Sequence, residues 1–311
     1  MSSTGASAES SVRIICGPTG AGKSAIAMRL AEAHNAVIIS ADSRQVYRCF
    51  DIGTAKPTAA ERDRVPHRGV DVADASERYS AARWAESARA WIAQARAVGR
   101  EALIVGGTGF YLRALVDPLF ESPELDPVRR AALERSFKRI DTEELRRWCV
   151  NLDPDRSHLG RTQLIRSLET AMLTGHTLTE LHRTRARAPT MEARYLVVDP
   201  GPSLATRIER RFDEMLASGW AQEVDALIQS VDESAPAWKA SGYGVMREMI
   251  AGRLSAEVAR ERVIIETRQY AKRQRTWFRH QIDAALATRI DPNDPAAEAY
   301  VNDWWDGRGI A

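Results

Sequence analysis

Short runs of mostly apolar residues recur along this chain, and longer segments with helical periodicity separate them. Residues 12–16, 37–40, 102–105 and 195–198 are such runs. Continuous apolar runs of this length, unlike alternating ones, are typical of parallel strands that are covered on both faces. We therefore predict an α/β fold with a parallel sheet flanked by helices, and we expect residues 69–72 to add a further short strand.

Segments with apolar residues three and four positions apart lie between these runs. Residues 80–98 and 204–217 follow that spacing, and each segment ends near a glycine. Glycine is common just past the end of a helix because it accepts a left-handed backbone. A last long helix is predicted from residue 254 to about residue 287.

The pattern changes between residues 117 and 189, where strand signals give way to successive helical patterns. A helical block placed between two strands is expected to form a small domain inserted into the sheet domain. The sequence therefore predicts a discontinuous core domain with an inserted all-helical domain. The expected boundaries are 12–116 and 190–290 for the core domain, 117–189 for the insertion, and 1–11 and 291–311 for two tails. In the second tail, docking of Trp304 and Trp305 on the core is the alternative to a simple acidic tail.

The composition is that of a globular protein with a sizeable core. The chain has 311 residues, 44% of them apolar, and its net charge is only +2. The charge is unevenly spread, since residues 260–279 hold seven Lys or Arg against two Glu, whereas residues 281–311 hold two Arg against six acidic residues. A basic stretch of this kind suits a polyanionic partner.

Neither a membrane nor a disulfide framework is indicated. No apolar run approaches the length that spans a bilayer, and the first eleven residues lack the features of a signal peptide. Cys16, Cys49 and Cys149 have no paired spacing, which favours reduced thiols. We expect a cytoplasmic protein.

A phosphate-binding motif directly follows the first apolar run. Its spacing is G-x-x-x-x-G-K-[ST], in which backbone N–H groups surround phosphate oxygens, the lysine adds a cation and the hydroxyl suits Mg²⁺. Helix-forming residues follow, so the phosphate is also expected at a helix N-terminus. The motif does not specify the phosphate compound, and it predicts Mg²⁺ as cofactor with Ser24 as a metal ligand. It consists of Gly17, Pro18, Thr19, Gly20, Ala21, Gly22, Lys23 and Ser24.

Two further segments follow predicted strands at the edge where parallel sheets bind ligands. Asp42 comes after the run 37–40, and both a helix N-cap and a site residue are compatible with it. Gly106 and Gly107 come after the run 102–105, where a nucleotide hydrolase is expected to carry an aspartate for Mg²⁺. The missing aspartate weakens the interpretation as a nucleoside triphosphatase.

The last predicted helix carries a basic and aromatic segment at residues 270–279. Lys272, Arg275 and Arg279 recur at three and four residues and are expected to share one helix face. Cations spaced in this way beside aromatic residues suit contacts with a nucleic-acid backbone. A solvated surface helix is the alternative.

Together these segments resemble tRNA dimethylallyltransferases, the isopentenyl-diphosphate:tRNA transferase family of bacteria. The resemblance spans residues 12–280 and implies transfer of a dimethylallyl group from dimethylallyl diphosphate to N6 of the adenosine on the 3′ side of the tRNA anticodon. The phosphate-binding motif is then expected to hold a diphosphate, and the protein to bind tRNA as a monomer. The matching segments are residues 17–24, 42–47, 52–57, 106–111 and 270–279.

The resemblance also implies roles for individual residues. Asp42 is expected to act as general base on the weakly nucleophilic N6 amine, and Thr19 and Arg211 are expected to act in catalysis at the diphosphate. The inserted domain is expected to bind the anticodon arm. The residues expected to bind tRNA are Asp42, Ser43, Arg44, Gln45, Thr108, Gln163, Leu164, Ile165, Arg166, Lys272, Arg273 and Arg275.

The chain departs from the family pattern at several positions. Gln163 replaces a usual arginine, which weakens the expected contact with tRNA there, and Arg44 replaces a common methionine. His67 and Arg68 stand where paired histidines are usual, and no zinc-finger pattern follows Arg279.

Three other functions are weighed against this one. A small-molecule kinase would need ATP and an acceptor hydroxyl, and the missing acidic residue after residue 105 counts against it. An RNA-binding protein with an inactive phosphate loop is disfavoured because Lys23, Ser24 and Asp42 are intact. A prenyltransferase for free adenine nucleotides is opposed by the helical insertion and by the basic helix.

Overall fold

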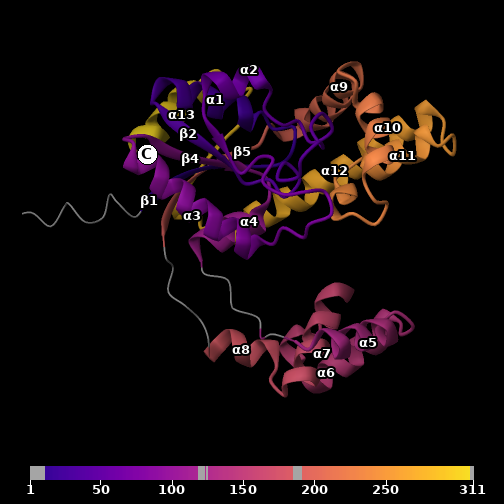
Figure 1. Ribbon diagram of the computed structural model, residues 1–311. Coiled ribbons are helices and arrows are strands. Elements are labelled where there is room, and N and C mark those ends of the chain that lie inside the picture. The colour runs from indigo at the N-terminus through magenta and orange to yellow at the C-terminus, as the bar shows by residue number, and fades with distance from the viewer. Residues whose placement is uncertain (1–10, 118–122, 124, 185–190, 309–311) are drawn as a thin grey trace, which may run out of the picture. The chain divides into compact units, whose positions relative to one another are not determined.

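The computed structural model describes residues 11–117, 123, 125–184 and 191–308 (Figure 1). The chain divides into two compact units, one made of residues up to 116 and from 190 onward, the other of residues 117–189. Each unit has a hydrophobic core of its own. The expected tail at residues 1–11 lies almost entirely outside the described residues.

A parallel sheet forms the centre of the larger unit and confirms the predicted α/β class. Its strands are β1 (Ser11–Cys16), β2 (Ala36–Ser40), β3 (His67–Arg68), β4 (Glu101–Gly106), β5 (Glu192–Val198) and β6 (Ala287–Ile290). Within the described residues the order is β3-β2-β4-β1-β5-β6, and every pairing is parallel. Ile14, Ile15, Ile39 and Ile104 are completely buried, which explains the unbroken apolar runs, because both faces of the sheet are covered.

Helices cover the two faces of the sheet. The helices α1 (Lys23–Ala33) and α13 (Ala297–Asp306) share one apolar core with β1, β2, β4 and β5. The helices α3 (Ala81–Ala97) and α4 (Gly109–Val116) pack together on the opposite side (Figure 1). A shorter helix, α2 (Ala59–Arg64), follows the segment 51–57. This arrangement leaves the loops at the carboxyl ends of the strands open to ligands.

A second group of helices lies beside the sheet (Figure 1). It consists of α9 (Leu204–Ala217), α10 (Trp220–Ser230), α11 (Tyr243–Ile250) and α12 (Ala256–Gln281). Contacts join α9 to α12, α10 to α11 and α11 to α12, and α12 also contacts α4. Ala271 of α12 packs with Leu204 and Ile208 of α9. The longest helix therefore connects this group to the loops that follow the strands.

The smaller unit is all helical within its described residues. Its helices are α5 (Pro127–Phe137), α6 (Thr142–Leu152), α7 (Arg161–Thr174) and α8 (Leu178–Thr184). Phe137, Leu145, Cys149, Leu164 and Leu168 form its buried core. None of the helices that the structure describes in either unit is long and apolar enough to cross a membrane.

Two strands differ from the sequence prediction. The strand expected at residues 69–72 lies two residues earlier, because Gly69 has φ +77° and turns the chain away from the sheet. The strand β6 extends the sheet beyond β5 and was not expected. The last long helix consequently ends at Gln281 and not near residue 287.

The expected tail at residues 291–311 is also corrected by the structure. Residues 297–306 form α13, in which Val301, Trp304 and Trp305 are buried against the sheet. These three side chains recur at three and four residues and so face one side of the helix. The acidic residues of this stretch occupy the other positions, and the helix belongs to the core of the larger unit.

Replacing Trp304 by alanine tests whether α13 is part of that core. Trp304 is 1% exposed, and removing a buried tryptophan typically lowers the free energy of unfolding by about 3–5 kcal/mol. Urea unfolding of the variant measures the change. Leu286→Ala, at a side chain that is 51% exposed, is the matched control and is expected to change stability by about 0.5 kcal/mol or less. Equal stability of the two variants would show that α13 is a tail after all.

Candidate active site

The phosphate loop joins β1 to α1 and so has the predicted strand, turn and helix setting. Gly17, Gly20 and Gly22 have φ values of +141°, +78° and +95°, which residues with side chains rarely adopt. A Cβ on Gly17 would also lie 2.1 Å from the carbonyl oxygen of Val198 on β5. Glycine is therefore required both by the backbone conformation and by the approach of the neighbouring strand.

Lys23, the first residue of α1, turns back over the loop. Its Nζ donates a hydrogen bond to the carbonyl oxygen of Pro18 at 2.7 Å, and its side chain lines a cavity together with that of Ser24. Burial lowers the pKa of Lys23 to about 8, with a further contribution from the guanidinium of Arg211 and an opposing one from the carboxylate of Asp42. A bound anion would favour the charged amine, so the loop suits an anionic ligand.

The side-chain amide of Gln274 fixes the loop to α12. Its Oε1 accepts a hydrogen bond from the N–H of Thr19 at 2.8 Å, and its Nε2 donates to the carbonyl oxygen of Gly107 at 2.8 Å. The side chain is buried, so losing either bond would leave a buried polar group unsatisfied. The N–H of Thr19 thus binds the protein itself, although the motif predicts that loop N–H groups surround a phosphate.

Sequence analysis missed Gln274. The available signal is its place between Ala271 and Phe278, which are three residues before and four residues after it and are both buried. A polar residue on the buried face of a helix needs a hydrogen-bond partner. The identity of that partner depends on contacts between segments that are far apart in the sequence.

The two glycines at the end of β4, Gly106 and Gly107, are explained by crowding. A Cβ on Gly106 would lie 2.2 Å from the carbonyl oxygen of Ala41, and a Cβ on Gly107 would lie 2.3 Å from Nε2 of Gln274. Real Cβ atoms do not approach so closely, and the neighbour of Gly106 is backbone. An acidic Mg²⁺ ligand, as expected for a triphosphatase or kinase, therefore has no room at Gly106, and at Gly107 it would displace the side chain of Gln274.

Asp42 lies in a turn after β2 and not at the start of a helix. Its Oδ1 accepts a hydrogen bond from the N–H of Arg44 at 2.8 Å, as in an Asx turn. The interpretation as a helix N-cap is therefore wrong. The half-buried carboxylate instead lines the cavities described below.

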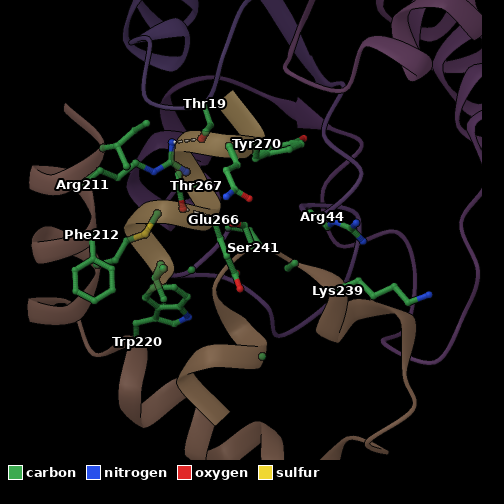
Figure 2. Close-up of a pocket in the computed structure, with 18 of the residues that line it drawn as sticks. Thr19, Arg44, Arg211, Phe212, Trp220, Lys239, Ser241, Glu266, Thr267 and Tyr270 are labelled. Carbon is green, nitrogen blue, oxygen red and sulfur yellow. Dashed lines mark hydrogen bonds between the residues drawn. The ribbon is translucent and has the colours of Figure 1, made fainter. Parts of the chain in front are cut away.

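Arg211 extends from α9 toward the phosphate loop. One of its guanidinium nitrogens donates to Oγ1 of Thr19 at 3.1 Å (Figure 2). Burial lowers the pKa of Arg211, while the carboxylates of Asp42 and Glu214 favour its charged form. The structure thus brings Thr19, Asp42 and Arg211, the three residues expected to act in catalysis, to one place from three separate elements.

Two cavities meet at these residues. The smaller, of about 330 Å³, is lined by the phosphate loop and by the loops after β2 and β4. The larger, of about 490 Å³, opens beside α9 and α12 and is drawn in Figure 2. Thr19, Asp42, Thr54 and Arg211 line both cavities. A ligand in each cavity would contact the same four residues.

The larger cavity has an apolar part and a charged part. Phe212 and Trp220 lie together on one side of it, and Arg44 and Lys239 lie on another (Figure 2). Arg273 of α12 also lines the cavity. Such a site can hold a flat apolar group inside and bind anionic groups at its edge.

Three predicted tRNA contacts near Asp42 are partly used inside the protein. Oγ1 of Thr108 accepts a hydrogen bond from the N–H of Ser43 at 3.0 Å. Nε2 of Gln45 donates to the carbonyl oxygens of Thr54 and Ala55. Ser43, Gln45 and Thr108 thus fix the loops of the site, and their contact with tRNA stays a prediction.

The basic residues of α12 do not all face the same way. Lys272 and Arg273 are exposed and line a surface groove with Trp277. The guanidinium of Arg275 is directed toward the loop that follows β5. Its Nε donates to the carboxylate of Asp199 at 3.0 Å, and its terminal nitrogen donates to the carbonyl oxygen of Gly201 at 2.5 Å. The expectation that Arg275 binds tRNA is therefore not supported by its geometry.

The predicted contacts in the insertion are corrected in part. Leu164 is completely buried in the core of that unit, so it cannot contact tRNA there. Ile165 packs against the same core and is half-buried. Oε1 of Gln163 accepts a hydrogen bond from the N–H of Gly160 and caps α7. Arg166 is exposed, and partial desolvation together with the nearby Arg156 and Arg130 lowers its pKa.

The phosphate loop and the two cavities that share four lining residues fit an enzyme that transfers a group between two substrates. Comparison with known proteins gives the family. The sequence profile described as IPP transferase matches residues 45–281, and the profile described as isopentenyl transferase matches residues 10–68. The chain belongs to the IPP transferase family.

Individual relatives agree with this assignment. The tRNA dimethylallyltransferase of Halorhodospira halophila is 40% identical over 93% of this chain and 96% of its own length. That of Alkalilimnicola ehrlichii is 43% identical over 87% of this chain and 88% of its own. The crystal structure of the tRNA isopentenylpyrophosphate transferase from Bacillus halodurans is similar with a TM-score of 0.68 and 31% identity, covering 96% of each chain.

The pKa of Lys23 predicts how diphosphate binding depends on pH. An organic diphosphate has lost its last proton above about pH 6, so its charge is constant while Lys23 titrates near pH 8. Affinity is expected to be full below that pH and to fall as the pH rises through it, because the neutral amine no longer attracts the anion. Calorimetric titration with an organic diphosphate at several pH values measures the effect. Lys23→Met should bind the diphosphate more weakly, with an affinity that does not change with pH over this range. If the affinity of that variant still fell near pH 8, the pH dependence would not come from Lys23.

Proposed function

We propose that the protein transfers the dimethylallyl group of dimethylallyl diphosphate to N6 of the adenosine on the 3′ side of a tRNA anticodon. The observation that carries the proposal is that Thr19, Asp42, Thr54 and Arg211 line both cavities. Transfer requires a donor and an acceptor that touch each other and are shielded from water. The substrates are those named by the activity of the relatives, tRNA dimethylallyltransferase.

The smaller cavity suits the diphosphate of the donor. Negative charge grows on the diphosphate as the bond between its oxygen and C1 of the allyl group breaks. The cations of Lys23 and Arg211 and the N-terminus of α1 are placed to stabilise that charge. Thr19 accepts the hydrogen bond of Arg211 and so orients the guanidinium over the loop.

Mg²⁺ is the proposed cofactor of this cavity. Among the described residues, no cluster of three or more His, Cys, Asp or Glu side chains could hold a metal alone. Mg²⁺ commonly keeps water and substrate-phosphate ligands and takes only one or two ligands from the protein. The exposed hydroxyl of Ser24 at the cavity wall fits that role. When bound, the ion would neutralise charge on the leaving diphosphate.

Asp42 is the proposed general base. The exocyclic amine of adenine is a weak nucleophile because its lone pair is delocalised into the ring. A carboxylate that accepts an N6 proton raises the reactivity of the amine. The bond from oxygen to C1 breaks with its electron pair on the diphosphate, the bond from N6 to C1 forms, and the N6 proton passes to Asp42.

The larger cavity suits the acceptor base. A loop base must leave its stack to reach Asp42, at a cost of a few kcal/mol. Apolar contact with Phe212 and Trp220 and phosphate contacts with Arg44 and Lys239 are available to offset that cost.

The proposed partner is the anticodon stem-loop of tRNA. The exposed Lys272 and Arg273 and the helical unit 117–189 are proposed to bind the arm around the flipped base. A monomer is proposed as well.

Asp42→Asn tests the general base. Asparagine keeps an oxygen that accepts the N–H of Arg44 but cannot take the N6 proton, so kcat for label transfer from dimethylallyl diphosphate to an anticodon stem-loop is expected to fall by about 10²-fold or more. Calorimetry with the diphosphate should show little change in donor affinity. Glu61→Gln, which changes a carboxylate of α2, is the control for loss of one negative charge beside the smaller cavity.

Two outcomes would contradict the proposal. Full transfer by Asp42→Asn would exclude Asp42 as the base. Phosphoryl transfer from ATP by the unmodified protein, without transfer of the allyl label to RNA, would replace the proposed function by that of a kinase.

A further inference from the structure

The segment 51–57 contains a buried lysine that the reaction above does not use. Nζ of Lys56 donates to the carboxylates of Asp51 at 2.5 Å and of Asp71 at 2.6 Å and to the carbonyl oxygen of Tyr47. Its side chain is only 2% exposed. An ammonium has three donors, so all three are satisfied within the protein. Lys56 is therefore not available to bind a diphosphate.

Unusual backbone conformations surround this ammonium. Cys49, Ala55 and Asp71 have φ values of +67°, +47° and +58°, although none of them is glycine. Residues in this region persist only where surrounding contacts fix them. Lys56 follows Ala55 directly, and its ammonium binds the side chain of Asp71. The ammonium therefore links two of the segments that contain these backbone conformations.

A second cation supports the same carboxylate. Arg62 of α2 donates to the other oxygen of Asp71 at 2.7 Å. Burial alone would raise the pKa of Asp71, but the hydrogen bonds from Lys56 and Arg62 outweigh it and hold that pKa below its ordinary value. The carboxylate thus stays charged and keeps its hold on Lys56.

The segment held by Lys56 forms part of the wall common to the two cavities, because Thr54 lines both. Nε2 of Gln45 donates to the carbonyl oxygens of Thr54 at 3.2 Å and of Ala55 at 2.8 Å, and its Oε1 accepts from Oγ of Ser40 at 2.8 Å. Ser40 ends β2, two residues before Asp42. A displacement of the segment would therefore reach the junction where donor and acceptor meet.

The other end of the segment is anchored independently. Glu223 of α10 accepts hydrogen bonds from the N–H groups of Asp51 at 3.0 Å and Ile52 at 2.7 Å. The hydroxyl of Tyr243 donates to the same carboxylate at 2.6 Å. Loss of the Lys56 ammonium is thus expected to loosen residues 54–57 without detaching the whole segment.

We propose that Lys56 is a positioning residue that keeps the junction of the two cavities closed to water. The inference rests on the transfer reaction proposed above. By fixing the segment 51–57, Lys56 holds Thr54 in the common wall, and the electron-deficient C1 of the donor then meets the adenosine N6 and not a water molecule.

The competing reaction is hydrolysis of the donor. In both reactions the bond from oxygen to C1 breaks with its electron pair on the diphosphate. In hydrolysis a water oxygen forms the new bond to C1 and a proton passes to solvent, so that the product is an alcohol and not prenylated RNA. The ratio of alcohol to prenylated RNA measures how well the junction excludes water. Once the alcohol formed without enzyme is subtracted, that ratio does not depend on how much of the enzyme is folded.

The test compares three variants of the full chain with the unmodified protein. Lys56→Met removes the ammonium and keeps most of the side-chain volume. Asp71→Asn removes the negative charge that binds the ammonium of Lys56, and asparagine tolerates the left-handed backbone at that position. Arg64→Gln is the matched control, because Arg64 lies on α2 like Arg62 but forms an exposed ion pair with Glu32 of α1. Labelled dimethylallyl diphosphate and an anticodon stem-loop are supplied, and both products are counted.

The ratio of alcohol to prenylated RNA is expected to rise by about tenfold or more in Lys56→Met, to rise less in Asp71→Asn, and to stay unchanged in Arg64→Gln. If Lys56→Met does not fold, the ratio measured for Asp71→Asn tests the proposal. An unchanged ratio in the folded variants, with active unmodified protein, would overturn the role of Lys56 alone. Absence of prenylated RNA with the unmodified protein would instead overturn the proposed function.

Discussion

The site depends on the two hydrogen bonds made by the side-chain amide of Gln274. One holds the N–H of Thr19 in the phosphate loop, and the other holds the carbonyl oxygen of Gly107 after β4. Because the side chain of Gln274 is buried, both bonds are costly to lose, and they fix α12 against the carboxyl ends of the strands. The helix that carries Lys272 and Arg273 is thereby set beside the phosphate loop, where we propose that the diphosphate binds. Without these two hydrogen bonds, no side chain of α12 would join the phosphate loop to the loop after β4.

The charges at the junction follow from that arrangement. Lys23 and Arg211 approach the loop from α1 and α9, and burial lowers the pKa of both while Asp42 favours their charged forms. Two cations beside one carboxylate leave the cavity in need of a further anion. In the proposed reaction a diphosphate would supply that charge, and the same side chains would stabilise it as it departs as the leaving group. Binding of the donor and catalysis of its cleavage would then use one set of contacts.

The fold class and the phosphate loop were predictable because their signals are local, as in the glycine spacing of residues 17–22 and the apolar runs of the strands. The strand β6 is short and only partly buried, so it was missed. The apolar face of α13 lies among acidic residues, so the sequence left docking of Trp304 and Trp305 open as an alternative to a tail. Leu164 was expected to contact tRNA because all residues of the family motif around it were assigned to the RNA surface. Packing within the insertion instead directs its side chain into the core. Gln274 and Arg275 act through partners that are distant in the sequence, which no local pattern reveals.

The central claim is that the two cavities hold donor and acceptor against the same residues. A crystal structure of the protein with an anticodon stem-loop and an unreactive thio analogue of dimethylallyl diphosphate tests it most directly. The account predicts the diphosphate in the loop 17–24, in contact with Lys23 and Arg211, and an extruded adenine whose N6 lies between the allyl carbon and Asp42. A diphosphate bound elsewhere, or an adenine whose N6 is out of reach of Asp42, would contradict it.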